Sequence, residues 1–162
     1  MGAEVRLPLA ATALAVLALN CSGCALTQSP PPLGPWITPV HAYGFISCTG
    51  NTPIAWLRMD VAVDPNVLPG LVAHETQHII DIVSAGGCRP GLAAYYTNPL
   101  WYESRAYCAG FHELARRRLA PNVAAQIVEA APRIATSLGR TTDTVAAALQ
   151  YHCFTRLYTQ TP

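Results

Sequence analysis

The sequence predicts a single α+β domain that is mostly helical and contains a small antiparallel sheet. A chain of 162 residues has room for one domain of ordinary size with a core of its own. Two short apolar segments before residue 64 are the candidate strands, and from residue 64 onward apolar positions recur at three and four residues, which is typical of helices. The helical part is therefore expected to dominate.

The charge composition argues against nucleic acid as a partner. The net charge is +1, only 12% of the residues are charged, and the longest basic run is Arg116–Arg118. A nucleic-acid-binding domain needs a basic face, and this chain has no such stripe. We interpret the basic run as the solvated end of a helix.

Residues 1–24 have the pattern of an export signal. Arg6 precedes an apolar stretch from Leu7 to Leu19, which is too short for a comfortable membrane span. The following "CSGC" resembles the lipobox of bacterial lipoproteins, in which a cysteine becomes acylated, and Cys24 is the candidate anchor. The resemblance implies an exported envelope protein held at the membrane by lipid. Secretion as a soluble protein after cleavage, or retention as an uncleaved anchor, are the alternatives.

The remaining cysteines suit an oxidising compartment. With residues 1–24 set aside, four are left: Cys48, Cys88, Cys108 and Cys153. No two of them have the short Cys-x-x-Cys spacing of structural zinc sites, so we predict two disulfides, for which three pairings are open.

A proline-rich tether and two strands are expected next. Residues 25–40 contain five prolines and are predicted to be an extended tether, so the folded domain is placed at 41–162. Within it, "YGFISCTG" and "TPIAWLRMDVAVD" are the candidate strands, and the second alternates from Leu57 to Val63 as a half-buried strand does.

The rest of the domain is expected to be helical. The first helix begins near Pro69 and ends at Gly86 and Gly87, and "CRPGLAAYYTNP" is then predicted to be a loop. A second helix is expected from about 100 to 119. Two further helical stretches follow, one interrupted by Pro132 and one that begins with threonines suited to capping.

The first of these helices carries the motif H-E-x-x-H at His74, Glu75 and His78. Residues four apart lie on one face of a helix, so both imidazoles can reach one tetrahedral metal ion. Glu75 is rotated to the side of that face, where a general base would stand. The alternative is that the three polar residues fell at this spacing by chance in a disulfide-stapled structural protein.

The third ligand connects the sequence with a known class. A histidine six residues after the second one would indicate the metzincin pattern, but Ser84 occupies that position. The chain instead resembles the gluzincins, the thermolysin-like class whose third ligand is a glutamate on the next helix within Glu-x-x-Ala, because "WYESRAY" supplies Glu103 with Ala106. The resemblance covers residues 71 to 107. It implies a zincin-like core and a Zn²⁺ ion held by His74, His78 and Glu103.

Three other residues are candidates for a ligand or a supporting role. His112 falls on the opposite side of its helix from Glu103 and is predicted to be structural, and Glu113 ranks second to Glu103 as a ligand. Asp81 lies one turn beyond His78 and is expected to support a ligand rather than to bind the metal directly.

The implied reaction is hydrolysis of a peptide bond, with zinc activating a water and Glu75 taking its proton. Tyr95, Tyr96 and Tyr107 are candidates for stabilising the oxyanion, and "AWLRMDVAV" is the strand expected to align an extended peptide. The partners expected are a peptide or protein substrate and the membrane; nothing in the sequence indicates an oligomeric state. The alternative function is that of an envelope lipoprotein that binds zinc or a partner without catalysis.

Overall fold

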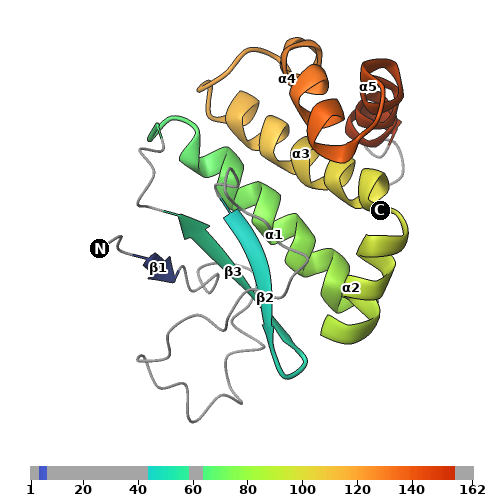
Figure 1. The fold of residues 1–162 in the computed structure, drawn as a ribbon. Helices are drawn as coiled ribbons and strands as arrows, with labels where there is room; N and C mark the ends of the chain where they lie inside the picture. The colour runs from blue at the N-terminus through green and yellow to red at the C-terminus, as the bar shows by residue number, and fades with distance from the viewer. Residues whose placement is uncertain (1–3, 7–43, 59–63, 156–162) are drawn as a thin grey trace, which may run out of the picture.

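The computed structural model describes residues 4–6, 44–58 and 64–155. Within these ranges the chain is mostly helical, with five α-helices and a small antiparallel sheet (Figure 1), which confirms the predicted α+β class. Cys24, the tether at 25–40 and the second half of the predicted strand, 59–63, lie outside the described residues.

The sheet is built on a hairpin. Strand β2 (Gly44–Thr49) and strand β3 (Thr52–Arg58) pair antiparallel, with Thr49 opposite Thr52, and Gly50 takes the left-handed backbone conformation that the tight turn requires. A short strand β1 (Glu4–Arg6) pairs with the other edge of β3, giving the order β1-β3-β2. Strand β1 belongs to the segment predicted to be an export signal, so cleavage at Cys24 would remove it from the sheet.

Helices α1 (Leu68–Ser84) and α3 (Pro99–Arg116) form the centre of the molecule. Helix α1 lies between the sheet and α3 (Figure 1). The two helices cross closely, because a Cβ atom added at Gly110 would come within 2.9 Å of the carbonyl oxygen of Gly70. A side chain at Gly110 would therefore keep the two backbones apart.

The segment after α1 is a helix and not the predicted loop. Helix α2 spans Cys88–Thr97, and its first backbone N–H donates to the side chain of Asn51 at 2.9 Å. Pro90 lies in the first turn, where a missing N–H costs nothing, and Gly87 provides the left-handed turn that separates α1 from α2. The prediction failed because Asn51, which caps this helix, comes from the distant hairpin.

The C-terminal region packs α4 (Val123–Leu138) and α5 (Thr142–Gln150) against α3, followed by a short π-helical turn, η2 (Tyr151–Thr155). Pro132 does not interrupt α4 as predicted. Pro132 lies on the exposed side of the helix, as does Val128, whose carbonyl loses its partner. Thr141 caps α5 with its side chain, as expected from the threonines at that position.

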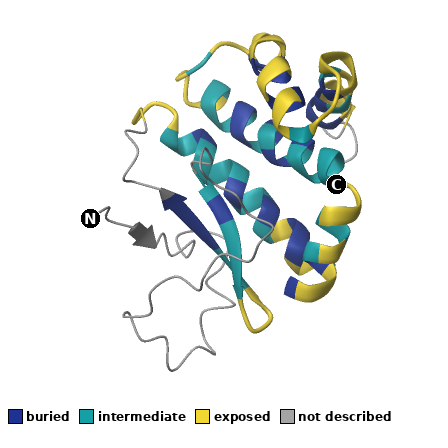
Figure 2. Cartoon of the chain, in the orientation of Figure 1, coloured by how far each residue is buried: buried dark blue, intermediate teal, exposed yellow. Residues whose placement is uncertain are grey.

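The structure selects one of the three disulfide pairings. Cys48 pairs with Cys88 and joins β2 to the start of α2, and Cys108 pairs with Cys153 and joins α3 to η2. Buried residues gather on the inner sides of the helices, and exposed residues lie along the outer sides of α4 and α5 (Figure 2). Among the described helices, none has both the length and the apolar character needed to cross a membrane.

Candidate metal centre

Three side chains from α1 and α3 converge on one point. The Nε2 atoms of His74 and His78 are 3.2 Å apart, and the Glu103 carboxylate oxygens lie 3.6 Å from Nε2 of His74 and 3.5 Å from Nε2 of His78. The close crossing of the helices at Gly70 and Gly110 brings the α3 carboxylate within reach of the α1 imidazoles. These three residues could hold a metal ion.

The spacing and chemistry of the donors fit zinc. Ligand atoms at about 2.0–2.1 Å from a tetrahedral Zn²⁺ ion are roughly 3.3 Å apart, close to the observed separations. Two imidazole nitrogens and one carboxylate oxygen are also a donor set of catalytic zinc sites, which keep a fourth position open. The side chains of His74 and Glu103 are 14% and 15% exposed, so the centre is shielded without being sealed.

Burial and mutual charge set the protonation of the three candidate ligands. Burial lowers the pKa of His74 to about 4, so this imidazole is neutral at pH 7. Burial also lowers the pKa of His78, but the hydrogen bond to Glu103 and the neighbouring carboxylates outweigh it and raise the pKa above its usual value. Burial raises the pKa of Glu103, yet the two histidines and Tyr95 bring it down to about 2. Glu103 is therefore ionised and ready to bind a cation.

Glu75 is buried next to the ligands without being one of them. Its side chain lies against Gly44, the first residue of β2, where a Cβ atom would collide with the carboxylate. Burial raises the pKa of Glu75 to about 7, which places the group near the pH at which a general base works best. The Glu75 carboxylate therefore fits at this position only because residue 44 is a glycine and has no Cβ atom.

Tyr95 supports the carboxylate ligand. Its hydroxyl donates a hydrogen bond of 2.6 Å to Oε1 of Glu103, and burial together with the Glu103 charge raises the pKa of the phenol. The residue comes from α2, the helix that sequence analysis predicted to be a loop. Tyr96 is 50% exposed, and its ring packs against Tyr95, so that Tyr95 stands between it and Glu103.

Tyr107 lies directly beside the centre. Its ring packs edge-on against His74 with centroids 4.6 Å apart. Burial and the charges of Glu103 and Glu75 raise its pKa to about 12, so the hydroxyl keeps its proton at neutral pH. The hydroxyl of Tyr95 is already bonded to Glu103, and Tyr96 contacts Tyr95. Tyr107 combines a ring that contacts His74 with a hydroxyl that makes no hydrogen bond to His74, His78 or Glu103.

Asp81 and His112, the other candidates near the site, have structural partners. Asp81 forms an ion pair with Arg105 at 2.9 Å and accepts a hydrogen bond from Gln77, so it is joined to α3 and stands outside the ligand triad. His112 bonds to the backbone oxygen of Cys153, in line with the structural role predicted for it.

Glu113, the second-ranked ligand, is engaged at the end of α3. Its carboxylate accepts hydrogen bonds from Arg116 and Arg117, both of which are exposed, and these bonds lower the pKa of Glu113 to about 2. The arginine run is thus the solvated helix end that the sequence predicts.

Two features of the site are not predictable from the sequence: Gly44 beside Glu75, and Arg105 as the partner of Asp81. Gly44 lies 31 positions before Glu75, and a lone glycine at the start of a strand carries no signal that the Glu75 carboxylate will fold against it. Comparison of the chain with protein-family models, with curated proteins and with solved structures finds no match. Its function must therefore be argued from the site itself.

Proposed function

We propose that this protein is a zinc-dependent peptidase of the gluzincin type. The observation that carries the proposal is the convergence of His74, His78 and Glu103 at separations that suit one tetrahedral ion, with the carboxylate of Glu75 buried next to them. A metal site that served structure alone would have no need for an additional carboxylate buried beside the ligands.

Each residue of the site has a separate role in the proposed reaction. His74, His78 and Glu103 would hold a Zn²⁺ ion, which supplies a Lewis acid for the substrate carbonyl and for water. Glu75, buried beside the ligands, accepts a proton from the attacking water and delivers it to the leaving amine. Tyr107 keeps its phenolic proton at neutral pH, so its hydroxyl can donate a hydrogen bond to a developing oxyanion.

An extended peptide is the substrate that the sheet favours. The strand expected to align it, β3, lies between β2 and β1 in the described sheet, and cleavage at Cys24 would remove β1 and open the outer edge of β3. Strand β2 pairs with β3 alone among the described strands and begins at Gly44, against Glu75. A peptide added along β2 would pass Glu75, so β2 takes the place of β3 in this part of the proposal.

The setting we propose is the cell envelope. Two disulfides suit an oxidising compartment, and the signal pattern with Cys24 as lipid anchor would attach the domain to a membrane through the tether at 25–40.

The test is zinc content followed by turnover. The chain is produced with both disulfides formed, and zinc per chain is measured for the wild type and for Glu103→Ala. We expect one zinc in the wild type and a clear loss in the variant. Wild type and Glu75→Gln are then incubated with a mixture of unstructured peptides, and new termini are identified by mass spectrometry. Cleavage by the wild type and at least a hundredfold less by Glu75→Gln, with zinc retained, is the expected result.

Three outcomes would contradict the proposal at different levels. A folded, oxidised wild type without zinc would make the motif a helix with polar residues at a chance spacing. Zinc binding without any peptide cleavage would favour the alternative of a non-catalytic zinc-binding lipoprotein. Cleavage that survives in Glu75→Gln would remove Glu75 from the role of general base.

A further inference from the structure

A buried ion pair joins the two helices that carry the metal ligands. The guanidinium of Arg105 on α3 lies 2.9 Å from the carboxylate of Asp81 on α1, and the two side chains are 10% and 2% exposed. Asp81 follows His78 by three residues, and Arg105 follows Glu103 by two. The pair is thus placed within one helical turn of a ligand on each helix.

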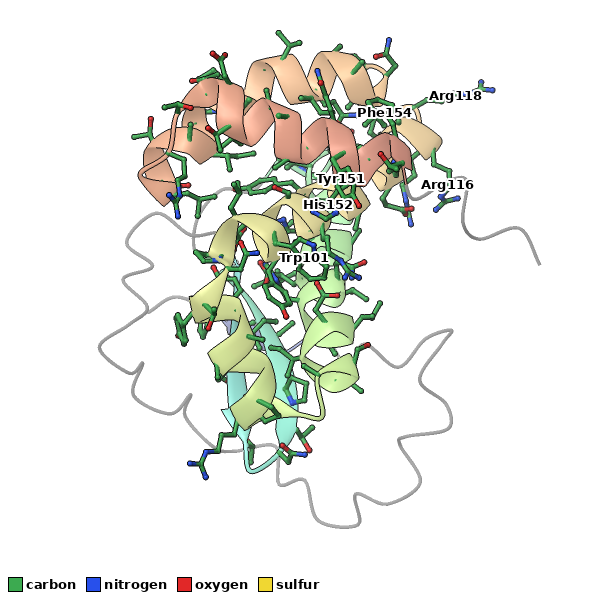
Figure 3. All side chains as sticks on the ribbon, turned by 90° about the vertical axis from the view of Figure 1, so that its right-hand side faces the viewer. Trp101, Arg116, Arg118, Tyr151, His152 and Phe154 are labelled. Carbon is green, nitrogen blue, oxygen red and sulfur yellow. A yellow bond between two sulfur atoms is a disulfide. The ribbon has the colours of Figure 1, made fainter. Side chains whose placement is uncertain are left out.

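Both partners of the pair are held by further contacts. Gln77 donates a hydrogen bond of 2.8 Å to Asp81, and Arg105 stacks over the ring of Trp101 at 4.3 Å. Trp101 in turn packs against His152, which lies in η2 (Figure 3). Because η2 is tied to α3 by the disulfide at Cys153, the guanidinium is supported from its own side of the interface as well as from α1.

We propose that Asp81 and Arg105 are positioning residues that set the register of α3 on α1, so that Glu103 meets His74 and His78. This inference rests on the proposed metal site and deepens it. Two backbones that cross without a side chain at Gly70 and Gly110 are close, but small residues do not by themselves define how far one helix slides along the other.

The ion pair between Asp81 and Arg105 fixes how far α3 can slide along α1. A charge that is buried without its partner is costly, so the pair is satisfied only when α1 and α3 stand at one register. A slide of one helix by a single residue would move its side chains by about 1.5 Å along the axis, which is enough to spoil the separations of about 3.5 Å between Glu103 and the histidines. Metal binding is therefore expected to depend on a pair that does not touch the metal.

The test compares metal binding in the full chain with and without the pair. Arg105→Lys keeps the positive charge but loses the planar fork and the stacking on Trp101, so it is the variant that keeps the fold. Asp81→Leu combined with Arg105→Met removes both charges together and leaves neither buried alone. Glu113→Gln, which breaks an exposed ion pair on the same helix, is the matched control.

Two quantities are measured for each protein: the zinc dissociation constant, by competition with a chelating dye, and the visible absorption spectrum after loading with Co²⁺. We expect zinc binding to weaken at least tenfold in Arg105→Lys and further in the double variant, with altered cobalt bands in both and no change in Glu113→Gln. A role in stability alone would lower the melting temperature and leave the spectrum of the folded, cobalt-loaded protein unchanged.

The outcomes separate this inference from the proposed function. Wild-type zinc affinity and a wild-type cobalt spectrum in Arg105→Lys and in the double variant would overturn the positioning role while leaving the metal site intact. A wild type that binds neither zinc nor cobalt would overturn the proposed function and this inference with it.

Discussion

The hydroxyl of Tyr95 donates a hydrogen bond of 2.6 Å to the carboxylate of Glu103. The bond joins α2 to α3 and occupies one lone pair of Oε1, which leaves Oε2 for a metal ion. It also helps to keep Glu103 ionised by lowering its pKa. The carboxylate is thus oriented and charged by the protein before any metal arrives.

We expect Tyr95→Phe to weaken zinc binding by about tenfold, because partners that orient a ligand carry tenfold to hundredfold effects on metal affinity. The competition assay with a chelating dye gives the dissociation constant. Tyr96→Phe is the matched control, since Tyr96 is half-exposed and its ring lies against Tyr95. Equal zinc affinity in the two variants would show that the hydrogen bond does not contribute.

We expect Gly44→Ala to reduce peptide cleavage by at least tenfold while leaving zinc content unchanged. The new Cβ atom would occupy the space of the Glu75 carboxylate, which must swing away from its position beside the ligands. None of the three ligands is touched by the change. Thr49→Ala, at the exposed end of the same strand, serves as the control. Full cleavage by Gly44→Ala would mean that the carboxylate works from more than one position.

The metal-free protein should show a pH dependence that originates in Glu75. Its pKa is raised from 4.5 to about 7 by burial, so between these values the unfolded chain loses the proton while the folded chain keeps it. This group's contribution to folding is complete below pH 4.5 and falls by about 1.4 kcal/mol per pH unit until the folded pKa is passed.

Glu75→Gln has the shape of the protonated acid and cannot ionise. We therefore expect the variant to match the wild type in stability near pH 4.5 and to exceed it increasingly toward pH 7, when urea unfolding is followed in the presence of a chelator. A difference in stability that stays constant over this range would contradict the raised pKa.

At the helix crossing, replacing glycine by alanine should lower the stability of the protein, although the same change usually stabilises an exposed helix. Replacing an exposed helical glycine by alanine stabilises by up to about 1 kcal/mol, but Gly110→Ala would press its Cβ against the backbone oxygen of Gly70 and is expected to destabilise by about 1–3 kcal/mol. Gly70→Ala meets the side chain of Leu114, which can rotate, so we expect a smaller loss. Urea unfolding of both variants checks the order.

Local patterns were sufficient to predict the helix that carries His74, Glu75 and His78, because helical periodicity and the turn residues after it depend on neighbours within a few positions. Glu103, which α3 brings to the two histidines, is predicted from the resemblance of "WYESRAY" to the gluzincin pattern and not from helical periodicity. The mostly helical class and the even set of four cysteines also follow from the sequence.

Contacts between residues far apart in the sequence determined the features that local patterns could not predict. Helix α2 begins with a hydrogen bond to Asn51, and the disulfide partners are 40 and 45 residues apart, so neither feature could be found in a local window. The hydrogen bond from Tyr95 to Glu103 depends on that same helix. Gly44 and Arg105 acquire their places only when β2 and α3 pack on α1, because the space around a buried carboxylate is a property of the packed chain.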